Sequence, residues 1–236
     1  MDSNYKNRLF VGLIILLVVT FSFILNLDLY LISIIILLVT YDFYNIKITN
    51  LLILVILFLL PFISNFLFTK LIRDTFYIYI CLVILILFFN QKFKKELFLL
   101  SVYLFCVILF NILSSDRNIF YIILFISFFN DTTAYIFGKS IGGPLIIPKI
   151  SPKKTWSGTI ISFVLSTSLL FFLKFDIFLS ATISIFLFIG DIFFSYFKRL
   201  LNLDDFSSIL KSHGGILDRI DSMFFVTIIF QIYLII

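Results

Sequence analysis

The sequence predicts an all-α polytopic membrane protein of about nine transmembrane helices, with a cytoplasm-facing polar site in its C-terminal half. Of the 236 residues, 62% are hydrophobic and only 13% are charged, and the mean hydropathy is +1.19. This composition excludes a soluble globular domain. The apolar runs suit helices that cross a hydrocarbon core about 30 Å thick, which takes roughly 20 residues each. The strand-like alternation of a β-barrel is absent.

Nine apolar runs are expected to be the spans, with boundaries correct to a few residues. Asn26 and Asp28 provide a turn between the first two, which form either two spans or one re-entrant pair. No small-residue cleavage site follows residues 9–25, so this run is expected to be a first helix and not a cleaved signal peptide. The predicted spans are residues 9–26, 29–43, 50–67, 75–90, 97–113, 118–137, 157–173, 176–197 and 219–236.

The orientation follows from the loops, because Lys and Arg are retained on the cytoplasmic side. With the N-terminus inside, 14 of the 18 basic residues lie in cytoplasmic segments. The four others are Lys70, Arg73, Arg117 and Lys174. We therefore expect a multi-pass protein of the cell (inner) membrane, with the N-terminus and the charged loops near residues 139–156 and 198–218 in the cytoplasm.

The two halves of the chain differ in composition. Seven of the eight glycines and three of the four prolines lie at or after Gly138. A backbone rich in Gly and Pro at membrane depth needs protein or water around its polar groups. We therefore interpret residues 1–130 as N-terminal transmembrane helices that act as a scaffold, and residues 131–236 as the C-terminal transmembrane region that holds the working site.

A first polar cluster begins at Asn130 and Asp131 and continues through Gly138 and Lys139 to Gly158. Glycines permit close backbone approach, and the lysines and hydroxyls among them suit a polyphosphate. The alternative is a basic cytoplasmic loop beside anionic lipid headgroups, which is common.

A second polar cluster is sharper. In a helix over residues 176–199, Asp191, Ser195 and Lys198 lie on one face near the cytoplasmic end. Asp218 and Asp221 share a face at i, i+3 and are expected to open the final helix. Two sets of carboxylates suit an oxygen-ligated Mg²⁺ that holds substrate phosphates. The alternative is a pair of helices joined by salt bridges.

His213, the only histidine, stands between these carboxylates in the segment His213-Gly214-Gly215. A lone histidine is more often a hydrogen-bonding structural residue than a catalyst. We favour a role in ordering the turn or contacting a phosphate over general acid–base chemistry.

Together the two clusters resemble the phosphatidate cytidylyltransferase (CDP-diacylglycerol synthase) family of integral membrane enzymes. Upstream, Asp131, Ala134, Tyr135, Gly138 and the run from Ser151 to Thr155 match a second block of that family, and Gly190-Asp191 matches the pair that opens its signature helix. The resemblance covers residues 130–236. The signature positions are matched by Ser195, Lys198, Arg199, Asp205, His213, Gly214, Gly215, Asp218, Arg219 and Asp221.

The resemblance implies the reaction of CTP with phosphatidate to give CDP-diacylglycerol and pyrophosphate, with Mg²⁺ as cofactor. It assigns Asp191 and Asp218 as metal ligands, with Asp221 and Asp205 as further or outer ligands. The implied catalytic residues are Asp191, Asp218, Asp221, Lys198, Arg199 and His213. The implied substrate-binding residues are Ser195, Asp205, Gly214, Gly215, Arg219, Asp131, Tyr135, Ser151, Lys153, Lys154 and Thr155.

Some positions depart from the family pattern: Asp204 for Lys, Lys211-Ser212 for Pro-Gly, Ser157 for Glu, and Phe194 for a polar residue. The expected partners are CTP, phosphatidate and the lipid bilayer, with a possible homodimer and no nucleic acid. The alternatives are another CTP-dependent lipid enzyme, such as a polyprenol kinase or a CDP-archaeol synthase, and a transporter. A transporter more often carries symmetric helix interruptions in both halves, whereas here they lie only in the second.

Overall fold

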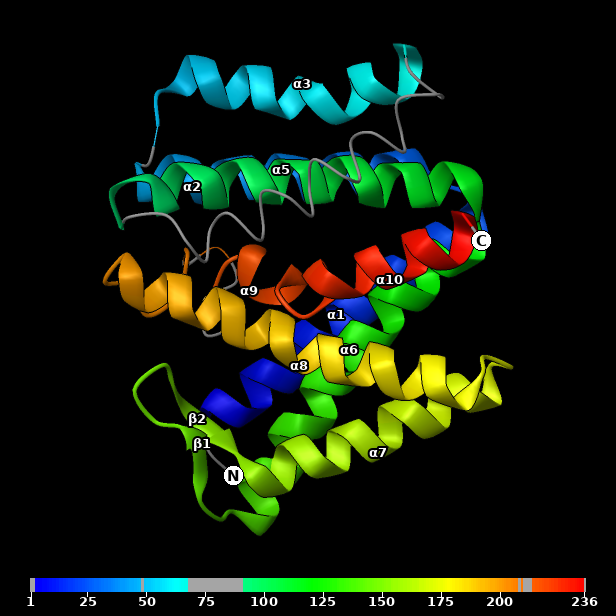
Figure 1. Ribbon diagram of the computed structural model, residues 1–236, viewed down its shortest axis with the longest axis vertical. Coiled ribbons are helices and arrows are strands. Elements are labelled where there is room, and N and C mark those ends of the chain that lie inside the picture. Colours follow the sequence, from blue (N-terminus) through cyan, green and yellow to red (C-terminus); the bar gives the residue numbers. More distant parts are fainter. Residues whose placement is uncertain (1–2, 48, 68–90, 208, 210–213, 236) are drawn as a thin grey trace. The chain divides into compact units, whose positions relative to one another are not determined.

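The computed structural model describes residues 3–47, 49–67, 91–207, 209 and 214–235, and these are mostly helical (Figure 1). Two short strands pair antiparallel as a hairpin. The elements in chain order are α1 (Ser3–Leu25), α2 (Asp28–Ile46), α3 (Leu51–Leu67), α5 (Gln91–Ser115), α6 (Arg117–Ile141), β1 (Leu145–Ile147), β2 (Ser151–Thr155), α7 (Trp156–Phe172), α8 (Ile177–Leu200), α9 (Leu217–Ile220) and α10 (Met223–Ile235).

The helices have the length and composition of membrane spans. Helices α2, α5, α6 and α8 are long and apolar enough to cross a bilayer, and α1, α3, α7 and α10 contain shorter apolar stretches. This confirms a helical, multi-pass type of chain. The predicted run at residues 75–90 lies outside the described residues, and the count of nine spans stays a prediction.

The chain folds into two compact units that are not two consecutive stretches. The first unit contains residues 1–121, 205–218 and 234–236, and the second contains residues 122–204 and 219–233. The first unit thus combines the N-terminal helices with a loop from the C-terminal half. The expected functional division at residue 130 is a separate question and stays a prediction.

The core of the first unit is built around α2. Its buried face meets α3 and α5, and Phe43 packs its ring against Phe98 and Tyr103 of α5, with centroids 6.0 and 5.9 Å apart. At the start of α2, Asp28 accepts hydrogen bonds from Arg117 Nε (2.7 Å) and Tyr121 Oη (2.5 Å). These bonds tie the α1–α2 turn to the first turn of α6.

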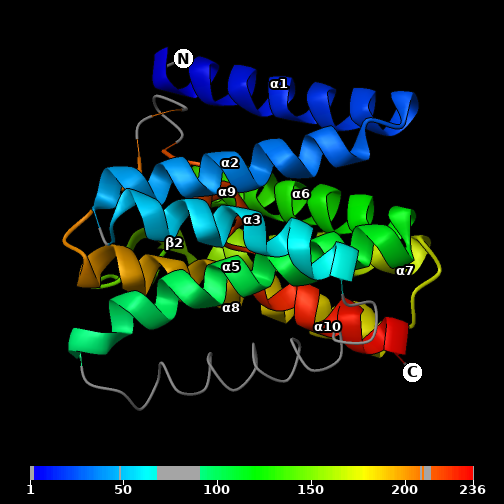
Figure 2. The same cartoon turned by 90° about the horizontal axis from the view of Figure 1, so that it is seen from above.

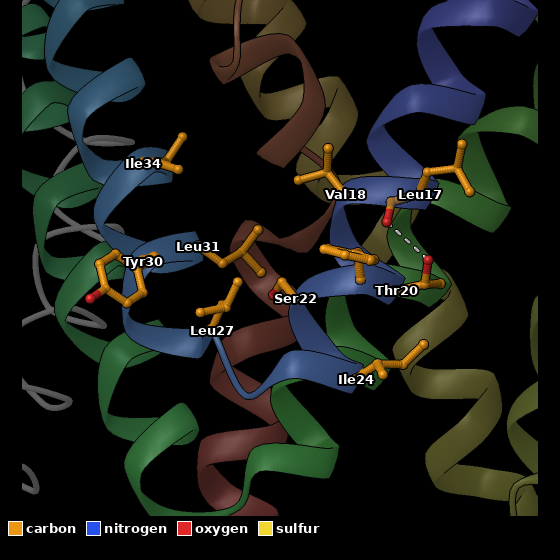
Figure 3. A pocket seen from close by; sticks show the side chains of 10 residues that line it. Leu17, Val18, Thr20, Ser22, Ile24, Leu27, Tyr30, Leu31 and Ile34 are labelled. Atoms are coloured by element: carbon orange, nitrogen blue, oxygen red, sulfur yellow. Dashed lines mark hydrogen bonds between the residues drawn. The ribbon is translucent and has the colours of Figure 1, made fainter.

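An apolar groove of about 620 Å³ lies between α1 and α2. In Figure 3, Leu17 and Ile24 of α1 lie on one side of the groove, and Tyr30 and Ile34 of α2 lie on the other. All four side chains are exposed. Such a surface is what lipid chains would cover in a helix that lies in a membrane.

The second unit is organised by the pair α7 and α8, which run side by side (Figure 1). The Thr155 side chain caps the N-terminus of α7 by accepting from Gly158 N. The Asp176 side chain caps α8 in the same way, accepting from Phe178 N at 2.8 Å. These caps satisfy backbone N–H groups that have no partner within their helices.

Two details of the sequence prediction are wrong. The segment interpreted as a loop before α7 contains the β1–β2 hairpin, a short two-stranded addition to a mostly helical chain. The final helix does not open with Asp218 and Asp221. Asp218 lies in the single-turn α9, Asp221 lies in the turn that follows, and the long final helix begins only at Met223.

Candidate functional site

The second unit gathers three carboxylates that come from different parts of the chain. Asp131 lies on α6, Asp191 on α8 and Asp221 in the turn between α9 and α10. Each of the three lies close enough to the other two for their charges to interact. Like charges held together need nearby cations or hydrogen-bond donors.

Gly190 brings two of these carboxylates together. A Cβ atom at this position would overlap the backbone oxygen of Asp221 and lie 3.0 Å from that of Ser222. Only glycine therefore allows the backbone of α8 to approach this turn so closely. Asp191 follows directly in the sequence and is placed beside Asp221.

Ser222 links the turn to α6. Its backbone N–H donates to Asp221 Oδ1 at 2.9 Å, and its hydroxyl lies 3.5 Å from Asp131 Oδ2. The same hydroxyl is hydrogen-bonded to Ser127. Asp131 Oδ1 is buried and has no hydrogen-bond partner among the described residues. A buried acceptor without a partner is unusual in a folded protein and favours a missing ligand at that point.

Three cations surround the carboxylates. Lys154 of β2 forms an ion pair with Asp191, and its ammonium lies 5.7 Å from the centre of the Phe188 ring. Lys198 lies within electrostatic range of Asp221, and Arg219 within that of Asp131. The cluster therefore brings both signs of charge together from α6, α8, β2 and the α9–α10 region, an arrangement suited to metal-bound phosphates.

The position of Lys154 on the β1–β2 hairpin depends on a close approach of α6 and α7 at Gly158. A Cβ atom at Gly158 would overlap Ala134 O and lie 2.9 Å from Gly138 Cα. Small residues at such a crossing let helices approach to backbone contact. Since β2 leads directly into α7, this contact sets the position of Lys154 beside α8.

Arg199 makes three hydrogen bonds at the end of α8. Its guanidinium donates to the backbone oxygens of Ile150 and Leu203, both at 3.2 Å, and to Asp204 Oδ1 at 2.8 Å. The hydrogen bond from Arg199 holds the pKa of Asp204 below its ordinary value. Arg199 thus joins the β1–β2 turn to the end of α8, and its expected contact with a substrate phosphate stays a prediction.

Two further departures from the family pattern have local explanations. Phe194 is fully buried and packs edge-on against Phe224, with ring centroids 5.2 Å apart. Ser157 donates a hydrogen bond to Gly142 O and so fastens the loop before β1 to the start of α7. Lys211 and Ser212 lie outside the described residues.

The remaining second-unit residues predicted to bind substrate have mixed environments. Lys153 is exposed on β2, whereas Ser151 and Ser195 are buried, and Tyr135 is half-buried on α6. Thr155 is occupied as the helix cap described above. None of these placements tests the predicted contacts with substrate.

The loop at residues 205–218 belongs to the first unit. There Asp218 is buried, and its Oδ2 accepts hydrogen bonds from Gly215 N (2.7 Å) and Phe206 N (3.1 Å). Gly214 has φ +74°, and a Cβ atom on it would overlap Asp218 Oδ2 and lie 3.2 Å from Asp205 Cβ. Glycine at this position therefore has a steric basis. His213 lies outside the described residues.

Asp42 is a residue that the sequence analysis missed. It lies on α2, is fully buried, and accepts hydrogen bonds from Ser207 Oγ (2.6 Å) and Leu217 N (2.9 Å). The signal was a carboxylate inside a predicted span, because placing an ionisable side chain there costs free energy and usually indicates a functional role. It was overlooked because the N-terminal half was interpreted as scaffold.

The predicted metal ligands belong to different units, Asp191 to the second and Asp218 to the first. Within the described ranges no three Asp, Glu, His or Cys side chains form a ready metal site. The donor types nevertheless fit Mg²⁺, which prefers carboxylate oxygens and completes its shell with water and substrate phosphates. The unpartnered Asp131 Oδ1 fits the same group.

Comparison with known proteins decides the family. Residues 6–236, nearly the whole chain, match the sequence profile described as the Cytidylyltransferase family. The chain belongs to this family.

Three similar proteins illustrate the relationship, and each is named phosphatidate cytidylyltransferase. The protein of Rickettsia bellii is 41% identical over 109 residues, which are 39% of this chain and 47% of that protein. That of Aquifex aeolicus is 36% identical over 151 residues, 61% of this chain and 57% of the relative. That of Staphylococcus aureus (strain COL) is 42% identical over 115 residues, 44% of each. The matched chain thus spans about half the length of these curated relatives.

Proposed function

We propose that this protein is a phosphatidate cytidylyltransferase, which transfers the cytidylyl group of CTP to phosphatidate and releases CDP-diacylglycerol and pyrophosphate. The observation that carries the proposal is the cluster of Asp131, Asp191 and Asp221 with Lys154, Lys198 and Arg219. It supplies both acidic and basic groups at one place in a chain of membrane-spanning helices. The family and the names of the relatives support the same activity.

In the proposed reaction a phosphate oxygen of phosphatidate attacks the α-phosphorus of CTP. The new P–O bond forms as the bond from the α-phosphorus to the oxygen bridging to the β-phosphate breaks, and pyrophosphate leaves. Two anionic substrates must approach each other, so the task of the protein is mainly positioning and charge neutralisation. Lys154, Lys198 and Arg219 are the groups that would bind and orient the phosphates.

Mg²⁺ is the proposed cofactor, and it would supply charge neutralisation at the nucleotide phosphates. Asp191 is the proposed principal ligand, and Asp131 and Asp221 lie in the same cluster to hold the ion or its bound water. Asp218 is assigned to the metal by resemblance and remains part of the proposal. Lys154, the ion-pair partner of Asp191, would be free to move to a phosphate when the cation binds.

The proposed setting is the inner membrane, with about nine spans and with the N-terminus and active-site loops in the cytoplasm. The support is the excess of Lys and Arg in the segments placed inside. A homodimer is part of the same proposal by resemblance to the family.

The test uses the full chain, purified in detergent, with CTP labelled either at the α-phosphorus or at the γ-phosphorus. With phosphatidate and Mg²⁺, we expect only the α-label to enter the lipid fraction, in a product that migrates as CDP-diacylglycerol. Entry of the γ-label would instead show a kinase, since a kinase transfers the terminal phosphate.

Acceptor choice separates the remaining alternatives. Phosphatidate, an archaeal ether-lipid phosphate and a polyprenol are compared at equal mole fraction in mixed micelles. Preference for the ether lipid would show a CDP-archaeol synthase. The proposed function would be contradicted if neither label were transferred to any acceptor by protein whose thermal unfolding transition shows that it is folded.

A further inference from the structure

Asp42 makes contacts that join two distant segments of the chain within the first unit. The carboxylate lies near the end of α2, and its two partners are 165 and 175 residues further on. Oδ1 accepts from the Ser207 hydroxyl and Oδ2 accepts from the Leu217 backbone N–H. One buried side chain therefore connects both ends of the loop at residues 207–217.

The burial of Asp42 makes these two hydrogen bonds important. A carboxylate buried in an apolar helix loses its hydrogen bonds to water, and donors of the protein must replace them. Among the described residues the donors to Asp42 are the Ser207 hydroxyl and the backbone amides of Leu217 and Ile216, and no described ion pair joins it to a lysine or arginine. The arrangement is therefore better explained by a need for the loop geometry than by charge pairing.

Gly215 packs against Asp42 without spare room. A Cβ atom on Gly215 would overlap Asp42 Oδ2 and lie 2.7 Å from Ser207 Oγ. Gly215 N in turn donates to Asp218 Oδ2. Asp42 and Asp218 thus lie on either side of the same glycine, and the position of one limits the position of the other.

Asp218 also depends on the loop for its orientation. Its Oδ2 accepts from Phe206 N and Gly215 N, which come from the two ends of the loop that Asp42 connects. If the Ser207 and Leu217 contacts were lost, the two amides that fix Asp218 would no longer be held at a set separation.

We propose that Asp42 is a positioning residue, which joins the ends of the 207–217 loop and thereby orients the Asp218 carboxylate. The contribution to catalysis rests on the proposed function, because Asp218 is assigned there as a metal ligand. The contribution to loop geometry does not rest on it. An alternative anchor is Phe206, whose ring stacks on Phe98 with centroids 6.0 Å apart.

The first experiment measures the loop without any substrate. Ile209, which is 37% exposed, is replaced by cysteine in a background lacking Cys81 and Cys106, and it carries a nitroxide spin label. We expect Asp42→Asn and Asp42→Ala to increase the label's mobility in the EPR spectrum, and Ser207→Ala to do so to a smaller extent. Asn keeps the volume of the side chain but replaces one acceptor by a donor.

Asp28→Asn is the matched control. Asp28 is the other carboxylate of α2, it also accepts two hydrogen bonds, and it lies 14 residues earlier, about 21 Å along the helix. We expect it to lower the thermal transition while leaving the label at position 209 unchanged. Unchanged label mobility in both Asp42 variants would show that Phe206 packing alone holds the loop, and would overturn the proposal.

The second experiment measures turnover. For Asp42→Asn we expect the Mg²⁺ concentration for half-maximal activity to rise about tenfold. We expect kcat to fall by a similar factor, because a hydrogen bond to a charged group is removed. The KM for phosphatidate should change less than about twofold. Ser207→Ala should give a smaller shift in the same direction, and the double variant less than the sum of the two effects.

The two experiments distinguish failure of the proposed function from failure of the role proposed for Asp42. A wild-type protein that makes no CDP-diacylglycerol contradicts the proposed function, while the spin label still decides the loop geometry. A lower kcat and thermal transition with unchanged Mg²⁺ dependence would show a merely structural role for Asp42, and would overturn its assignment as a positioning residue.

Discussion

The three clustered carboxylates differ in their partners, and this difference indicates what each can do. Asp191 is paired with a lysine, Asp221 accepts from a backbone amide, and Asp131 keeps one buried oxygen without a partner among the described residues. An ion pair is readily exchanged for a metal ion, whereas an amide contact is fixed by the backbone. In the proposed reaction, Asp191 is therefore the residue whose partner would change when a cation and substrates bind.

Removing the charge of Asp191 should abolish turnover. Asp191→Asn keeps the size of the side chain but removes an anionic oxygen ligand, so we expect kcat to fall by about 100-fold or more. Incorporation of α-labelled CTP into lipid measures this, with membrane insertion checked by detergent extraction.

Asp204→Asn provides the comparison for that variant. Asp204 is 95% exposed in its side chain and contacts only Arg199 among the described ion pairs, so we expect less than about a twofold change. Near-normal Mg²⁺-dependent activity in Asp191→Asn would instead identify the Lys154 pair as a structural ion pair.

The close approach of helix α8 to the Asp221 turn depends on a single residue, Gly190. Gly190→Ala places a methyl group against two backbone oxygens, and backbone atoms cannot rotate away. We expect a loss of about 1–3 kcal/mol in the free energy of unfolding and a strong loss of activity, since the Asp221 turn must move. Thermal unfolding in detergent and lipid labelling measure the two effects.

Gly138→Ala is the control at a neighbouring helix. Its Cβ atom would meet the Thr155 hydroxyl at 2.9 Å, and this side chain can rotate away at the loss of its cap on α7, about 1 kcal/mol. The gain in helix propensity, about 1 kcal/mol, should offset part of the strain. Equal destabilisation by both substitutions would show that the close approach at Gly190 is unimportant.

The helical elements could be predicted from the sequence, and two irregular ones could not. Apolar runs of membrane length predicted α1, α2, α3, α5, α6, α7 and α8 to within a few residues at most ends. The β1–β2 hairpin was missed because its strands have three and five residues and no alternating pattern. The break after α9 was missed because an i, i+3 pair of carboxylates fits a helix equally well.

The orientation of the whole molecule can be tested by labelling. Cysteines introduced at Ser140 and Ile209, both exposed, should react from the cytoplasmic side in inside-out vesicles, because 14 of the 18 basic residues are then inside. An impermeant maleimide applied to intact cells measures the opposite face. Reaction of either position only in intact cells would contradict the proposed orientation.

The candidate site could be predicted only where the sequence carries a motif. The family signature identified Asp191, Arg219 and Asp221, and the structure brings them into one unit with Asp131 and Lys154. It did not identify Asp42, although a carboxylate inside a predicted span was a signal of a special role. The partners of this carboxylate, Ser207 and Leu217, could not be predicted, because they lie 165 and 175 residues further on and meet Asp42 only after folding.

The contacts of Asp42 also affect how this family can be recombined. In a chimera that joins residues 122–236 to the N-terminal helices of a relative, the 207–217 loop would face whatever residue stands at the end of the second helix. An apolar residue there would leave the buried Leu217 N and the half-buried Ser207 Oγ without their acceptor. The N-terminal helices are thus not an exchangeable membrane anchor, and a donor half is suitable only if it brings its own carboxylate to this position.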